Sequence, residues 1–156
     1  MNVQEFLREK HVEYHPIVHA ESRGAQHLAE ELHVPGRIVA KTVLLRADSG
    51  FAYIVAVLPA TKSIDFEKLS KAIGGSKLEL ATEVDMNEHC PDCEMGTLPP
   101  FGSQYAMQTI VDESLKQDVE IVFEANSHHE AIRMRYDDYH RIERPLVANF
   151  ATEMTE

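Results

Sequence analysis

Apolar positions along the chain follow a helical period in some segments and form strand-like runs in others. A first short helix is predicted over residues 3–7, where the apolar side chains have helical spacing. The segment 25–32 is a clearer helix, because its apolar residues fall at i, i+3, i+4 and i+7. The sequence "SIDFEKLSKAIGG" (63–75) has the same period and ends at paired glycines. A short helical turn is also predicted over 82–89.

Runs of β-branched and apolar residues predict strands through the centre of the chain. "RIVAKTVLL" and "FAYIVAVL" flank "RADSG", which indicates two paired strands joined by a turn. Further strands are predicted at 76–82, 104–111, 118–125 and 130–136, followed by a turn or short helix at 138–142. We therefore expect a mixed α/β fold, with one curved mixed central sheet flanked by helices. The order of the strands does not follow from the pattern.

Length and charge limit the possible functions of this chain. Its 156 residues suit a single domain, which we place at residues 1–150, with a C-terminal tail at 151–156. The net charge of −11 argues against non-specific binding to DNA or RNA, although a small basic site could still bind a short nucleic-acid end. The chain shows no membrane span, secretory signal or disulfide framework. These features predict a cytoplasmic protein that is not bound to a membrane.

Lys41 is the first candidate functional residue, because every close neighbour in "IVAKTVLL" except Thr42 is apolar. Burial of an ammonium group is unfavourable unless the group is paired or lines a cavity. Val39, Lys41 and Val43 share one face if this segment is a strand, and a face of that kind is typical of a cleft wall. An ordinary solvent-exposed lysine on the strand is the alternative.

The segment "MGTLPPFG" is the second candidate, with Gly96 and Gly102 on either side of Pro99, Pro100 and Phe101. Glycine permits positive φ and a close approach of the backbone to a ligand, whereas proline stiffens the chain. Such a loop can present amide N–H groups to a carbonyl or phosphate oxygen. A rigid connection between two strands, with no ligand, is the alternative.

Histidines and cysteines give weaker signals. His128 and His129 precede a predicted strand, where adjacent side chains point to opposite faces, so at most one of them serves a given site. Cys90 and Cys93 form a single CxxC, too few ligands for a structural zinc site. They lead into the Pro/Gly loop rather than a helix, unlike a redox motif. We therefore expect two ordinary reduced cysteines and no metal site. We also expect no cofactor, since no nucleotide or hydrolase motif is present.

Taken in order, these motifs resemble the YbaK/prolyl-tRNA-synthetase-associated editing domain family in its stand-alone form. The resemblance rests on "VAKTVLL", on "PDCEMGTLPPFG" some 50 residues later and on "NSHHEAIRM", and it runs from about His15 to Ile142. "YHPIVHAESRGAQHLAEELHVPGRIVAKTVLL" also matches the opening helix and lysine strand of the family. The lysine strand followed by the G-x-x-P-P-F-G loop is specific, whereas each motif alone is not.

The resemblance implies an aminoacyl-tRNA deacylase, a hydrolase that removes mischarged amino acids and protects translation fidelity. It implies that Lys41 holds phosphate near the 3′-terminal adenosine, and that the loop from Gly96 to Gly102 holds the aminoacyl carbonyl. Pro99, Pro100, Phe101 and His128 would shape the substrate pocket, with His19 as a further candidate. Family members remove different small residues, such as alanine, cysteine or proline.

The partner implied by the resemblance is the acceptor end of an aminoacyl-tRNA. Because the body of the protein is acidic, we expect it to depend on the terminal nucleotides, with a synthetase or other partner holding the rest of the tRNA. A non-catalytic module that binds a nucleotide or aminoacyl-nucleotide in the same cleft is the alternative function. A zinc or redox protein built on Cys90 and Cys93 is a third.

Overall fold

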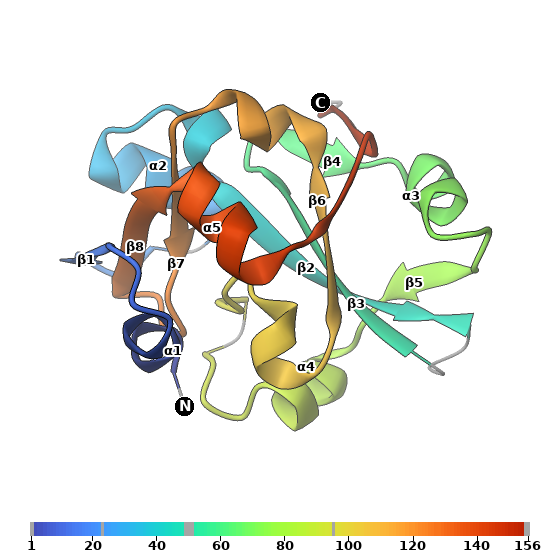
Figure 1. Cartoon of the computed structure of the whole chain (residues 1–156), viewed down its shortest axis with the longest axis horizontal. Helices are drawn as coiled ribbons and strands as arrows, with labels where there is room; N and C mark the ends of the chain where they lie inside the picture. The colour runs from blue at the N-terminus through green and yellow to red at the C-terminus, as the bar shows by residue number, and fades with distance from the viewer. Residues whose placement is uncertain (1, 23, 49–51, 95, 155–156) are drawn as a thin grey trace.

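The computed structural model describes residues 2–22, 24–48, 52–94 and 96–154. A mixed sheet with the strand order β5–β2–β3–β6–β9 crosses the molecule (Figure 1). Its strands are β2 (Ala40–Ala47), β3 (Ala52–Pro59), β5 (Leu78–Leu80), β6 (Gln108–Asp112) and β9 (Leu146–Ala148). β2 is antiparallel to both β3 and β5, whereas β6 runs parallel to β3 and to β9. The expected mixed α/β fold is confirmed.

A second, antiparallel sheet has the order β1–β8–β7, and a separate pair joins β4 to β10. These strands are β1 (His15–Val18), β4 (Lys62–Ile64), β7 (Glu120–Glu124), β8 (Glu130–Arg135) and β10 (Ala151–Glu153). One parallel bridge, between Val39 and Val122, connects the beginning of β2 to β7. This bridge brings the two sheets together beside the candidate site.

Helices lie around the sheets (Figure 1). Polar caps define where several of them begin. They are α1 (Val3–Glu9), α2 (Ala25–Leu32), α3 (Phe66–Ala72), α4 (Glu83–His89) and α5 (Tyr136–Glu143). Asp65 accepts hydrogen bonds from the amides of the first turn of α3, and Thr82 forms a capping box with Asp85 at the start of α4. No helix in the described ranges combines the length and apolar character needed to cross a membrane.

Differences from the predicted elements arise where pairing between distant segments decides the conformation. Residues 63 and 64, predicted to begin a helix, instead belong to β4, because residues 151–153 pair with 62–64 as β10. Residues 151–153 were assigned to the C-terminal tail. The strand predicted over 104–111 begins only at Gln108, because Gly102–Tyr105 forms a short 3₁₀ helix. β1 was not predicted.

Phe101 anchors the Pro/Gly loop in the main core. Its side chain is fully buried, with its ring centroid 5.3 Å from that of Phe6, 5.7 Å from Phe123 and 5.1 Å from Tyr139. The hydroxyl of Tyr139 donates a hydrogen bond to the carbonyl of Pro100 at 2.9 Å. The loop is therefore held by aromatic packing and by a buried hydrogen bond.

Gly102 lies where the chain has no room for a side chain. A Cβ at this position would lie 2.6 Å from Thr109 Oγ1 and 2.8 Å from the carbonyl oxygen of Met107. We expect Gly102→Ala to lower the free energy of unfolding by about 2 kcal/mol, the typical cost of overpacking a core. Urea denaturation would measure the change.

Gly74→Ala is the matched control, because a Cβ there would meet no atom within 4 Å and only its φ of +91° opposes substitution. It should cost about 1 kcal/mol, the strain of a left-handed backbone. Equal stabilities for Gly102→Ala and the natural protein would contradict the prediction.

Candidate functional site

A small cavity opens where the beginning of β2 meets the Pro/Gly loop and the end of β7. It measures about 40 Å³ and is lined by Lys41, Thr42, Gly96, Leu98 and Glu124, together with Ala25, Val39 and Ala40. Residues from distant parts of the sequence thus share one wall. The structure brings together two residues predicted from the sequence, Lys41 and Gly96.

The bridge between Val39 and Val122 explains why Lys41 and Glu124 line the same cavity. Both valines are fully buried, and the bridge between them is parallel. Lys41 follows Val39 by two residues, and Glu124 follows Val122 by two. Because side chains two residues apart on a strand share a face, the lysine and the glutamate occupy equivalent positions on neighbouring strands.

Lys41 is partly buried, and this burial lowers the pKa of its ammonium group. No carboxylate of the described residues forms an ion pair with it. The ammonium group is therefore available to a ligand, and its partial desolvation strengthens any interaction with an anion.

Most backbone amides of the loop are already engaged. The Thr97 N–H donates to the Glu94 carbonyl at 3.1 Å, and the Phe101 N–H donates to the Pro99 carbonyl at 2.8 Å. The Gly102 N–H donates to Thr109 Oγ1 at 2.8 Å. Pro99 and Pro100 have no N–H.

Two amides of the loop remain. Within the described part of the chain, the N–H groups of Gly96 and Leu98 make no hydrogen bond, and both residues line the cavity. Gly96 has φ of +79°, a conformation that favours glycine. The structure therefore identifies Gly96 and Leu98 as the loop residues able to donate to a ligand.

The other predicted loop residues support the loop from behind and do not line the cavity. Pro99, Pro100, Phe101 and Gly102 are buried, and the Gly102 amide is not free for a carbonyl oxygen. Thr109 and Ser103 in turn donate to the buried carboxylate of Glu143. This network holds the chain at Gly102.

Glu124 was not identified from the sequence. The residue is only 8% exposed, and neither carboxylate oxygen has a hydrogen-bond partner within the described residues. Burial, with a smaller contribution from the charge of Glu94, raises its pKa to about 7. An acidic side chain of this kind in a cavity is typical of a functional site.

Neither predicted histidine lines the cavity: His128 lies beside Glu124, and His19 lies against the turn that contains His129. His128 Nδ1 is buried and lies 3.9 Å from Glu124 Oε2, too far for a hydrogen bond. The His19 N–H donates to the His129 carbonyl at 2.9 Å, which places β1 against this turn. His19 Nε2 is also buried, with no hydrogen-bond partner in the described ranges.

The structure joins Cys90 and Cys93 in a disulfide, so the expectation of two separate thiols is wrong. The tight turn after α4 brings their Cα atoms to 5.4 Å, within the range that a disulfide spans. Asp92 lies close enough to complete a three-residue cluster, but sulfurs bonded to each other cannot act as thiolate ligands.

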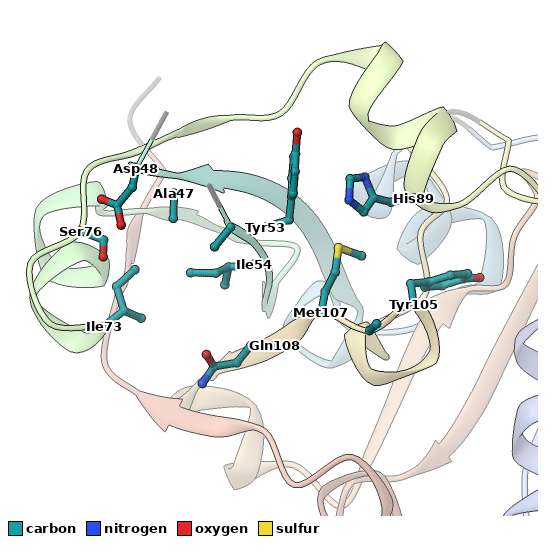
Figure 2. A pocket seen from close by; sticks show the side chains of 12 residues that line it. Ala47, Asp48, Tyr53, Ile54, Ile73, Ser76, His89, Tyr105, Met107 and Gln108 are labelled. Carbon is teal, nitrogen blue, oxygen red and sulfur yellow. The ribbon is translucent and has the colours of Figure 1, made fainter. Parts of the chain in front are cut away.

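A larger cavity of about 630 Å³ lies at the other end of β2 and β3 (Figure 2). Tyr53 and His89 stand on one side of it, with ring centroids 4.2 Å apart, and Met107 lies nearby. Tyr53 donates to Asp85 at 2.8 Å, and so its polar group is already engaged. Because none of the residues predicted to be functional lines this cavity, its size alone does not identify it as the site.

Comparisons with known proteins identify the family of this chain. The model of the aminoacyl-tRNA editing domain matches residues 19–142. The multifunctional Ser/Thr-tRNA deacylase ProXp-y of Escherichia coli (strain K12) is 29% identical over 99 residues, which span 63% of this chain and 59% of that relative. The chain therefore aligns with somewhat over half of the length of this curated relative.

Solved structures show the same fold at low sequence identity. Hypothetical protein APE2540 superimposes with a TM-score of 0.87 at 16% identity, covering 96% of this chain and 99% of the other. A candidate trans-editing enzyme for prolyl tRNA synthetase gives a TM-score of 0.82 at 18% identity, with coverages of 96% and 94%. Since the editing-domain model covers most of the sequence, this chain belongs to the aminoacyl-tRNA editing domain family.

Proposed function

We propose that the protein hydrolyses the ester bond of mischarged aminoacyl-tRNA. The observation that carries this proposal is that one cation and two residues with free amides line a single cavity. Lys41 provides the cation, and Gly96 and Leu98 provide the amides. Membership of the editing-domain family and the name of the E. coli relative support the same activity.

Lys41 is proposed to bind the phosphate next to the terminal adenosine. A lysine ammonium binds phosphate as a point charge, and it does so more strongly where water is partly excluded. This contact would fix the nucleotide outside the cavity and direct the acyl group inward. Orientation of this kind contributes substantially to catalysis when the substrate is already activated.

The amides of Gly96 and Leu98 are proposed to bind the ester carbonyl oxygen. They would stabilise the negative charge that develops on this oxygen during hydrolysis. A water molecule can act as the nucleophile, with the vicinal ribose hydroxyl available to hydrogen-bond it; the free amino acid and the ribose hydroxyl are released, so the reaction needs no nucleophilic side chain. Pro99, Pro100 and Phe101 would then contribute by holding the loop in a fixed conformation.

The size of the cavity supports small acyl groups as substrates. A buried water needs about 10–15 Å³ by this measure, so a cavity of 40 Å³ holds only a few heavy atoms. An acyl group with a side chain as small as that of alanine, serine or cysteine is therefore favoured over one with a larger side chain, which would need a greater movement of the walls.

A deacylation panel tests the proposed function. The protein would be incubated with alanyl-, seryl-, threonyl-, cysteinyl- and prolyl-tRNA, each on its matched and on a mismatched tRNA. We expect multiple-turnover ester loss for at least one small acyl group, on a mismatched tRNA. Absence of turnover with every substrate, despite saturable binding, would instead indicate a binding module.

The proposed partner is the acceptor end of tRNA. A net charge of −11 disfavours extended contact with the tRNA body. We therefore propose that a synthetase or another tRNA-binding protein holds the remainder.

A further inference from the structure

Glu124 has a position that the proposed hydrolysis does not yet explain. Its carboxylate lies in the same cavity as Lys41 and Gly96, and neither oxygen has a hydrogen-bond partner within the described part of the chain. A buried carboxylate without partners is unfavourable for folding. An interaction with a ligand would account for its presence.

Charge complementarity indicates which ligand group it contacts. The titratable groups that the structure places near Glu124 are Glu94, whose negative charge raises the pKa of Glu124, and His128, whose Nδ1 lies 3.9 Å from Glu124 Oε2. Lys41 lines the same cavity, yet it forms no ion pair with Glu124. The cavity therefore has a cationic position and a separate acidic one.

An aminoacylated terminal adenosine carries the matching pair of charges. Its phosphate is negative, and its α-amino group is positive when protonated. The ester carbonyl lies between these two groups. Gly96 and Leu98, whose amides would bind that carbonyl, line the same cavity as Lys41 and Glu124.

We propose that Glu124 binds the α-ammonium group of the acyl moiety and so makes the site selective for aminoacyl esters over esters without an amine. This inference rests on the proposed deacylase function. The residue would position the ester against the loop amides, and it takes no part in bond cleavage.

The test compares alanyl-tRNA with lactyl-tRNA, in which a hydroxyl of similar size replaces the ammonium. For the natural protein, kcat/KM should be at least about tenfold lower with lactyl-tRNA, because a hydrogen bond between charged groups contributes roughly 1.5–3 kcal/mol. The substitution Glu124→Gln should slow the hydrolysis of alanyl-tRNA by a similar factor. The variant should then cleave alanyl-tRNA and lactyl-tRNA at nearly equal rates.

Glu120→Gln is the matched control, because it removes one negative charge from the same strand at a residue paired with Arg133 on the surface. It should retain the preference for alanyl-tRNA. Equal cleavage of the two esters by the natural protein, or an unchanged preference in Glu124→Gln, would overturn the proposal while the deacylase function stands.

Binding measurements decide the same question if neither ester is cleaved. Alanyl and lactyl groups would be attached to 3′-amino-3′-deoxyadenosine 5′-phosphate through a stable amide and titrated by calorimetry. Tighter binding of the alanyl compound by the natural protein, lost in Glu124→Gln, supports the role of Glu124. Equal affinities overturn it, and the absence of turnover then counts separately against the deacylase function.

Discussion

Lys41→Met is expected to lower kcat/KM for deacylation by about a hundredfold, because truncation of one partner of a desolvated charge pair costs 2–5 kcal/mol. Methionine keeps much of the aliphatic stem and removes only the charge. If Lys41 anchors a phosphate that is bound equally in the ground and transition states, the loss appears mainly in KM. Initial rates over a range of substrate concentrations would separate KM from kcat.

Two further variants make the Lys41 prediction specific. Lys41→Arg keeps the charge in a different shape and should retain part of the activity. Lys71→Met removes an exposed lysine of α3 that does not line the cavity, and its kcat/KM should match that of the natural protein. Full activity in Lys41→Met would show that the phosphate is held elsewhere.

The sequence was sufficient to predict those parts of the candidate site whose residue types are unusual in their own segment. A lysine within an apolar strand and a Pro/Gly loop both conflict with ordinary secondary structure, which indicates a function for Lys41 and the segment containing Gly96. The helices at 25–32 and 82–89 and the β2–β3 pair were also predictable from local sequence. Apolar periodicity determines the first helix, a capping box begins the second, and runs of β-branched and apolar residues form the two strands.

Other features depend on pairing between distant segments, and the sequence pattern does not contain that information. Glu124 ends a strand that also begins with a glutamate, so alternation alone does not separate a buried acid from an exposed one. Its place beside Lys41 depends on the bridge between Val39 and Val122. The Gly102 amide donates its hydrogen bond to Thr109 Oγ1, and the position of Thr109 is set by the pairing of β6 within the sheet.

Glu124→Gln should stabilise the protein at alkaline pH, and this prediction needs no substrate. The pKa of Glu124 is about 7 in the folded protein, against 4.5 for the ordinary group. At pH values below 4.5 the carboxyl is neutral in both the folded and unfolded states, so glutamate and glutamine should be nearly equivalent. As the pH rises, the unfolded state releases its proton first, and the natural protein loses stability relative to the variant.

The difference in the free energy of unfolding between Glu124→Gln and the natural protein should be fully developed above pH 7. It should reach on the order of 3 kcal/mol, since each unit of pKa shift corresponds to 1.36 kcal/mol. Urea denaturation of both proteins at several pH values between 4.5 and 8.5 measures it. Glu120→Gln, at an ion pair on the surface, should change stability by less than about 1 kcal/mol. A difference in the free energy of unfolding between Glu124→Gln and the natural protein that stays constant across this pH range would contradict the raised pKa of Glu124.

The same measurement connects stability to function. An acid that destabilises the folded state by this amount, without a hydrogen-bond partner among the described residues, is expected where binding requires its charge. A bound α-ammonium group would lower the pKa of Glu124 and restore the lost stability. The alanyl amide analogue should therefore raise the melting temperature more at pH 7 than at pH 5.5 in the natural protein, and equally at both in Glu124→Gln, because an α-amino group with a pKa of about 7.7–8.0 is mostly protonated at both pH values.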